Sequence, residues 1–363
     1  MLKFSKFLVA TFVAISLVLS GAVFAQNQTP APVVDNEWDW LKLTSNEWLK
    51  GDLVALYDDS LEFDSDNLGL LSIDWGDVAE LYSKDSQSIR LTDDRILEGR
   101  LVYKDGQITI GGQAVDASML ISIASAADDE WGLWDGSISF GLDIKDGNTK
   151  QQDITTTAEI KRRSSSSRFQ TNYLGSHSKS TDVTTGIETT TVNSDRVNSF
   201  FDLFISQRLF FRAADYEYFS DEFQNIHSRN TLGIALGYTL VDTSDITLEM
   251  ALGPSYQITK FDVVAAGEED EEDSYVVSFS TTFDWEIVSD VDYFFDYNVK
   301  KVSEEAGNYL HHLETGIEIS VVNDLDVNFT YYVDRTDNPK ADDTGLVPEQ
   351  NDTRFVVSVS YDF

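Results

Sequence analysis

Hydrophobic and polar residues alternate along the C-terminal part of the chain, from about residue 131 to Phe363. The last segment, FVVSVSYDF, places Phe355, Val357, Val359, Tyr361 and Phe363 on one face. LDVNFTYYVD and LGIALGYTL have the same period of two. This period is typical of β-strands that present one apolar and one polar face. The pattern therefore predicts an all-β domain.

Turn residues divide this domain into twelve predicted strands. Their ranges are 131–145, 152–162, 167–176, 195–207, 210–219, 229–241, 245–259, 274–287, 291–302, 309–322, 324–334 and 353–363. The strand at 210–219 does not alternate cleanly. Short polar turns mostly alternate with longer connections such as 177–194, which is typical of an outer-membrane barrel with short periplasmic turns. We therefore predict a 12-stranded antiparallel transmembrane β-barrel with both ends of the domain on the periplasmic side. The loop 177–194, rich in Thr and Ser, is also a candidate for a constriction folded into the lumen.

Aromatic residues collect at the rim that the turns assign to the periplasm, as an interfacial girdle requires. They are Trp131, Trp134, Trp285, Tyr293, Tyr361 and Phe363. A terminal Phe363 two residues after Tyr361 also has the form of the signal read by the barrel-insertion machinery. That machinery, outer-membrane lipid and lipopolysaccharide are the partners that this fold predicts.

The first 25 residues have the pattern of a cleaved signal peptide. Lys3 and Lys6 precede the apolar run Phe7–Val18, and Val23-Phe24-Ala25 has small residues at the cleavage positions. A membrane anchor is the alternative, but the apolar core is short for one. Residues 26–37 are predicted to be a linker. Export to the outer membrane follows from these features.

Residues 38–125 are predicted to form a small periplasmic all-β module. Within it Leu43–Val54 (LTSNEWLKGDLV) resembles Leu91–Val102 (LTDDRILEGRLV) at a constant offset of 48 residues. Each copy is followed by a short alternating segment, so the repeat favours two similar sets of strands. Trp75 is predicted to pack in the core of this module.

Composition narrows the possible functions. The net charge is −37, with 63 acidic against 26 basic residues, and there is no cysteine. Nucleic acid is excluded as a partner because phosphate binding needs a basic surface. Disulfides, thiolate metal sites and a cysteine nucleophile are excluded as well. We interpret the acidity as an adaptation to a salty medium, where salt screens the repulsion between carboxylates.

Strand parity predicts which charged residues face the lumen. The acidic set is Asp143, Glu159, Asp202, Glu249, Asp284, Glu286, Asp292, Asp296, Glu314, Glu318, Asp326, Asp334 and Asp362. The basic set is smaller: Lys145, Lys161, Arg168, Lys300 and Arg354. Two interpretations remain open. An acidic lumen would make a pore that prefers small cations, whereas a paired network would plug a narrow barrel.

No motif predicts catalysis, a cofactor or a defined metal site. The four histidines are His177 and His227 in predicted loops and His311 and His312 near the outer rim. A lipid hydrolase would need one of the last two beside a serine. The acidic run Glu268, Glu269, Asp270, Glu271, Glu272 and Asp273 offers oxygen ligands for a divalent cation, but it lacks the spacing of a calcium loop and is expected to be solvated.

Two stretches carry a family resemblance. They are LKGDLVALYDDSLEFDSDNLGLLSIDWGDVAEL in the module and NTLGIALGYTLVDTSDITLEMALGPSYQ in the barrel. The best markers are Gly233, Gly237-Tyr238, Val241-Asp242-Thr243 and Gly253-Pro254-x-Tyr256. Over about residues 43–363 the chain resembles the salt-induced outer-membrane protein family, which is defined by a domain of unknown function. The resemblance implies an outer-membrane barrel and no catalytic residues.

These observations lead to one preferred function and two alternatives. The preferred prediction is a small channel or passive envelope component linked to salt or osmotic conditions, and not an enzyme. The first alternative is a non-conducting barrel whose periplasmic module binds a partner that the sequence does not identify. The second is an outer-membrane lipid hydrolase.

Overall fold

A computed structural model describes residues 37–57, 59–93, 95–126, 133–145, 150–206, 208–243, 245–288, 290–322 and 325–363. The predicted signal peptide, residues 26–36 of the predicted linker, Trp131 and the turn at Asn323 lie outside the described residues, as do the side chains of Asp143 and Lys145. No helix in the described part of the chain has the length and apolarity needed to cross a membrane.

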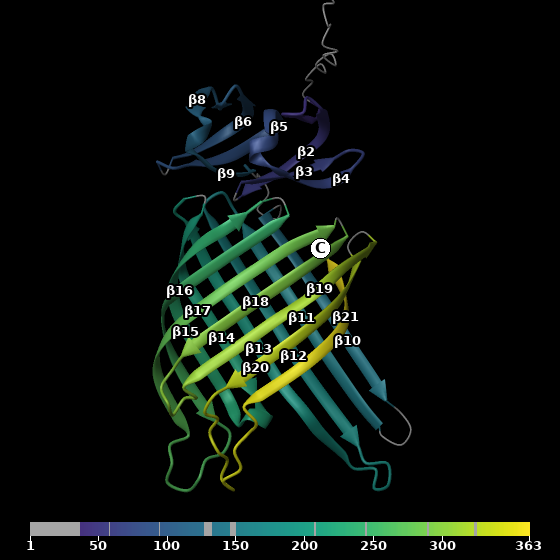
Figure 1. The fold of residues 1–363 in the computed structure, drawn as a ribbon, viewed down its shortest axis with the longest axis vertical. Coiled ribbons are helices and arrows are strands. Elements are labelled where there is room, and N and C mark those ends of the chain that lie inside the picture. Colours follow the sequence, from purple (N-terminus) through teal and green to yellow (C-terminus); the bar gives the residue numbers. More distant parts are fainter. Residues whose placement is uncertain are drawn as a thin grey trace, which may run out of the picture. The chain divides into compact units, whose positions relative to one another are not determined.

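The N-terminal module is a curled antiparallel sheet (Figure 1). Its strands are β1 (Asp39–Leu43), β2 (Trp48–Tyr57), β3 (Ser60–Ser65), β4 (Gly69–Asp74), β5 (Val78–Leu91), β6 (Ile96–Lys104), β7 (Gln107–Ile110), β8 (Gln113–Asp116) and β9 (Leu120–Ser125). The order is β4-β3-β2-β1-β5-β6-β7-β8, and β9 pairs with both β2 and β5. The 3₁₀ turns η1 (Trp75–Asp77) and η2 (Ala117–Met119) precede β5 and β9.

The two copies of the sequence repeat occupy equivalent places in this module. Each begins at the end of one strand and continues into the next, β1 to β2 and β5 to β6. Their shared leucines belong to or pack against one apolar core, as does Trp75. The shared glycines lie where another strand passes closely. A Cβ on Gly51 would meet the Asp64 carbonyl oxygen. Gly99 has a φ of +144°, and a Cβ on it would meet the backbone of Gly111. The repeat therefore marks positions that packing restricts.

A buried carboxylate ties the first strands of the module together. Asp39 on β1 is 2% exposed. Its two oxygens accept the backbone N–H groups of Leu53, at 2.5 Å, and Lys84. Burial raises the pKa of Asp39 because it disfavours the charged form, and these N–H donors oppose the shift.

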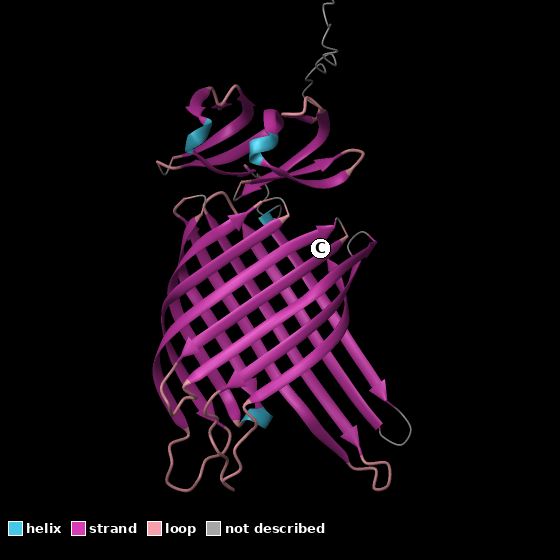
Figure 2. Ribbon diagram, viewed as in Figure 1, coloured by secondary structure: helices cyan, strands magenta, loops and turns pink. Residues whose placement is uncertain are grey.

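The C-terminal domain is a closed antiparallel barrel of twelve strands (Figure 2). The strands are β10 (Trp134–Lys145), β11 (Lys150–Arg163), β12 (Ser167–Thr181), β13 (Glu188–Phe204), β14 (Leu209–Asp221), β15 (Ile226–Asp242), β16 (Ile246–Phe261), β17 (Glu271–Val288), β18 (Val291–Lys301), β19 (Tyr309–Val322), β20 (Leu325–Thr336) and β21 (Asn351–Asp362). The predicted strand count and antiparallel order are confirmed. In Figure 1 the short turns lie at the upper rim of the barrel and the longer connections at the lower rim.

One predicted loop is wrong. Residues 177–194 continue the β12–β13 hairpin, with pairs such as His177↔Asn193 and Thr181↔Glu188, and only 182–187 connect the strands. The segment therefore forms no constriction inside the barrel. His227 likewise lies in β15, and Glu271 to Asp273 open β17, not a loop. These stretches carry polar residues on both faces, so they have no apolar alternation from which a strand could be predicted.

Burial in the barrel is the reverse of burial in the module. Large apolar side chains on its outer face are exposed, including Leu142, Leu232, Leu252, Phe355 and Tyr361. Polar residues that face the lumen are buried, including Asp202, Thr239, Gln257 and Thr259. An apolar exterior around a hydrogen-bonded, closed sheet is what a hydrocarbon environment requires. The barrel is thus of the outer-membrane type.

The first and last strands close the barrel over a short seam. Four residue pairs join β10 to β21, from Ser137↔Asp362 to Phe140↔Val359. Phe363 adds two backbone hydrogen bonds with Gly136, at 2.9 and 3.0 Å. The C-terminal residues, expected to act as an insertion signal, therefore also form the closure itself.

Cysteine cross-linking tests this seam, because the natural chain has no cysteine. Ser139 and Ser360 are paired across it, so the double variant Ser139→Cys/Ser360→Cys should form a disulfide in the refolded barrel. The readout is gel mobility with and without reductant. The control is Ser139→Cys/Asn328→Cys, whose second site lies one strand further on β20, about 10 Å away by strand spacing. Equal cross-linking in the two variants would contradict the register.

Candidate functional site

The lumen is the candidate site, because it holds a cluster of buried ionisable side chains. The parity prediction placed Asp202, Glu249, Lys300, Asp326 and Asp334 inside, and each is at most 9% exposed. Arg168 and Arg354 pair with carboxylates of this set. Asp284, Asp296, Glu314 and Glu318 line a cavity in the same lumen. Apart from Asp326, these residues belong to two ion-pair networks and one acidic chamber.

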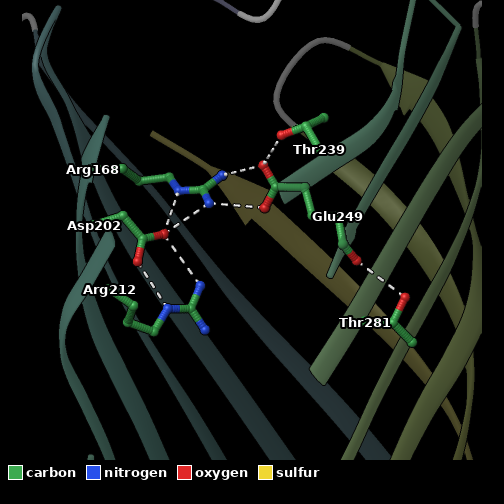
Figure 3. Close-up of polar contacts among 6 residues, drawn as sticks. All are labelled: Arg168, Asp202, Arg212, Thr239, Glu249 and Thr281. Atoms are coloured by element: carbon green, nitrogen blue, oxygen red, sulfur yellow. Dashed lines mark hydrogen bonds and ion pairs between the residues drawn. The ribbon is translucent and has the colours of Figure 1, made fainter. Parts of the chain in front are cut away.

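The first network lies near the short turns, and we name it the short-turn network (Figure 3). It joins Arg168 on β12, Asp202 on β13, Arg212 on β14 and Glu249 on β16. Arg168 donates to both oxygens of Glu249, at 2.8 and 3.2 Å, and to Asp202 at 2.9 Å. Arg212 donates to Asp202 at 2.8 and 3.2 Å. Asp202 is 0% exposed, so this carboxylate is stabilised by two guanidinium groups inside the barrel.

Aromatic rings and hydroxyl groups complete the short-turn network. The guanidinium of Arg212 lies 3.9 Å from the ring centre of Phe200, and that of Arg168 lies 5.4 Å from it. Thr239 donates to Glu249 at 3.4 Å, and Thr281 donates to the Glu249 backbone carbonyl at 3.1 Å. These contacts fix the arginines on one side of the lumen, against β12 to β16.

The second network lies nearer the long loops and crosses the barrel; we name it the cross-barrel network. Arg196 on β13 donates to Glu217 at 2.9 Å and to Asp334 on β20 at 2.5 Å. Lys300 on β18 contacts the other Glu217 oxygen at 2.5 Å. His312 and Arg354 contact Asp334 at 2.8 and 3.6 Å. Two carboxylates thus contact four basic groups.

The strand order shows that these contacts span the lumen. β13 and β20 are separated by β12, β11, β10 and β21 on one side and by six strands on the other. Arg196 and Asp334 therefore meet across nearly the full barrel. Arg196, Glu217, Lys300 and Asp334 are all buried. The cavity that remains among them is about 20 Å³, which is room for about one water molecule.

An acidic chamber occupies the short-turn half of the lumen, lined by β10 to β13 and by β17 to β21. Its volume is about 860 Å³, and it extends from Gly136 and Phe363 to Arg196 and His312. Its carboxylates are Asp135, Glu159, Asp284, Asp292, Asp296, Glu314, Glu318 and Asp362. Lys161 and Arg196 are the Lys and Arg residues of the lining, and both already form ion pairs.

The acids of the chamber include like-charge pairs on adjacent strands. Asp292 lies opposite Glu318, and Asp296 lies opposite Glu314, along β18 and β19. Directly opposed like charges disfavour a sheet. A nearby cation, or a proton shared between the two carboxylates, would relieve the repulsion at each pair.

Sequence reasoning missed four charged residues of the lumen. Arg196 and Arg229 have the parity of Asp202 and Thr239 on their strands, so that rule was sufficient to find them. The parity rule could not find Arg212 and Glu217, for a physical reason. A β-bulge between Arg212 and Asp215 changes the inward parity of β14 from even to odd. This bulge also explains why 210–219 does not alternate.

The histidines contact groups other than serine. His312 pairs with Asp334, and His311 contacts the Tyr297 hydroxyl at 2.7 Å. His177 contacts Asn193, and His227 contacts Asp262, both at 3.1 Å. Among the described residues, none of the four hydrogen-bonds a serine hydroxyl, as a Ser-His hydrolase would need.

The acidic run from Glu268 to Asp273 does not form a metal site in the described structure. Glu268 pairs with Lys340 at 3.1 Å and Glu271 with Lys260 at 3.0 Å. The described part of the chain contains no group of three or more His, Cys, Asp or Glu residues placed to hold a metal ion.

Unfolding measurements test the cross-barrel network. Asp334→Asn removes the carboxylate shared by Arg196, His312 and Arg354, and it should lower the free energy of unfolding by about 3–5 kcal/mol, because buried cations lose their partner. The control Glu271→Gln breaks an exposed pair with Lys260 and should cost at most about 1 kcal/mol. The midpoint of denaturant unfolding, followed by tryptophan fluorescence, gives both values. Equal midpoints would contradict a buried network.

Comparison with solved structures finds barrels of low sequence identity. The NanC porin structure has a TM-score of 0.37 at 9% identity, covering 63% of this chain and 98% of that one. The translocator domain of the autotransporter NalP from Neisseria meningitidis has a TM-score of 0.36 at 13% identity, covering 63% and 86%. The P. putida toluene transporter TodX has a TM-score of 0.27 at 10% identity, covering 76% and 86%. These likenesses concern the fold alone.

Comparison of sequences is more decisive. The chain matches no curated protein sequence. The model of the family described as protein of unknown function, DUF481, matches residues 138–363, which is the barrel from early β10 to the last residue. Since this match covers more than half of the chain, the protein belongs to the DUF481 family of outer-membrane-type β-barrels.

Proposed function

We propose that the protein is a closed outer-membrane barrel, a passive envelope component that does not conduct ions in its resting state. One observation carries the proposal: Arg196 and Asp334 meet at 2.5 Å from strands on nearly opposite sides of the barrel, and both are buried. The Lys300–Glu217 pair joins β18 to β14 in the same network. Buried ion pairs hold fixed positions, since separating them would leave charges unpaired.

The N-terminal features complete this proposal. Residues 1–25 would direct export and be removed. An even strand number returns both ends of the barrel to one side, and the turns on that side are the short ones, which are periplasmic in barrels of this class. The module at 38–125 would therefore lie in the periplasm, where a partner would bind it. The net charge of −37 supports a role in a salty medium.

A second candidate function is a small cation-selective pore, and the acidic chamber favours it. Eight carboxylates line about 860 Å³ of the lumen. A pore would need the cross-barrel network to open, because the chamber ends against Arg196 and His312. The closed barrel and the pore therefore differ in the state of one network.

Planar-bilayer recording of the refolded full chain separates the two functions. The wild type should insert with no steady conductance. The double variant Arg196→Ser/Asp334→Ser removes both ends of the widest crossing, and it should give discrete cation-selective steps. Steady steps of equal size in the wild type would contradict the closed barrel.

Selectivity in the opened barrel should depend on the chamber. Adding Asp296→Asn and Glu318→Gln to the double variant should shift its reversal potential toward zero in a salt gradient, because fixed negative charge on the wall is lost. Glu268→Gln and Glu269→Gln remove the same charge from the loop after β16 and should leave the potential unchanged. A shift of equal size in this control would rule out the chamber as the selective element.

A further inference from the structure

The cross-barrel network holds more hydrogen-bond donors than acceptors. Glu217 and Asp334 are its carboxylates, and between them they contact Arg196, Lys300, His312 and Arg354. Buried N–H groups still lack an acceptor at Nε of Arg196, Nε of Arg229 and Nη1 of Arg354. In and beside this network, three guanidinium donors therefore lack the acceptor that buried polar groups require.

Arg229 is the arginine left without a carboxylate. It lies near the start of β15, points into the lumen and is 5% exposed. Among the described residues no carboxylate lies within ion-pair distance of it. Glu217, Asp334 and Asp221 act on it only from farther away, and Arg196 opposes them. A cation buried in this way is costly unless an anion accompanies it.

The cavity beside Arg229 has the size of one small ion. Its volume is about 20 Å³, and its walls include Arg229, Arg196, Lys300, Asn298 and Thr336. This is enough for one water-sized particle and too little for a carboxylate, phosphate or sulfate group. The ring of Phe219 lies under both arginines, 4.3 Å from Arg196 and 5.4 Å from Arg229, and fixes their planes. Arg335, which is half-exposed, also lines the cavity. The cavity therefore lies near solvent at the long-loop end of the barrel.

We propose that this cavity binds a monatomic anion, chloride in a saline medium, held by the guanidinium groups of Arg229 and Arg196 that line it. The ion neutralises the arginine that the two carboxylates cannot serve. The site is distinct from the acidic chamber, and it binds its ion whether or not the barrel conducts.

Chlorine NMR line width measures this binding directly on the refolded full-length protein in detergent. Wild-type protein should broaden the chloride resonance in a saturable way, and bromide should reverse the broadening. Arg229→Gln should weaken the apparent affinity about tenfold or more, since a charge-assisted contact is lost. Arg229→Lys keeps the charge and should retain part of the binding. Lys179→Gln removes an exposed positive charge on β12 and should change nothing.

Thermal unfolding supplies the second measurement. The wild-type midpoint should be higher in sodium chloride than in sodium gluconate at equal ionic strength, and Arg229→Gln should remove that difference. Equal line widths with and without wild-type protein, together with equal midpoints in the two salts, overturn the proposal and assign the cavity to water. A chloride effect of equal size in Arg229→Gln overturns it as well. Should the variant fail to fold, the wild-type comparison of the two anions still decides.

Discussion

The rest of the barrel follows from one constraint: in hydrocarbon, every backbone N–H and C=O must find its partner within the protein. A closed sheet of twelve strands meets this constraint, because no strand is left as an edge. Closure then fixes the direction of every side chain. Residues of one parity face lipid and must be apolar, and their neighbours face a lumen of set width. The reversed burial of the barrel is the direct result.

A twelve-stranded lumen is too wide for apolar packing by short side chains and narrow enough for long ones to meet across it. Arg196 and Asp334 make such a contact, and Arg168 with Glu249 makes a shorter one within one side of the barrel. Arginine suits this place because its planar group binds two carboxylates at once, as Arg196 does with Glu217 and Asp334. The lumen thus has a core of ion pairs, whereas the module has a core of leucine and isoleucine.

The period of two was sufficient to predict the twelve strands, their order and the inward direction of Asp202, Glu249 and Lys300. It failed where its physical basis was missing. Residues 177–194 extend past the apolar band, so no face of that hairpin needs to be apolar. In β14 the bulge reverses the parity after Arg212. Partners across the lumen, such as Arg196 with Asp334, depend on the curvature and width of the closed sheet, and no local pattern carries that information.

Charge in the lumen is separated along its axis. The overall excess of acids lies partly in the chamber, where Asp296 opposes Glu314. Lys161 and Arg196, which line the described part of the chamber, form ion pairs with other carboxylates. The cross-barrel network has the opposite excess, since Glu217 and Asp334 are outnumbered by the basic groups around them. Each region lowers the electrostatic energy of the other, because the positive network closes the end of the negative chamber. The cross-barrel network therefore holds the arginine that bridges opposite walls, and unpaired acids line the chamber on its short-turn side.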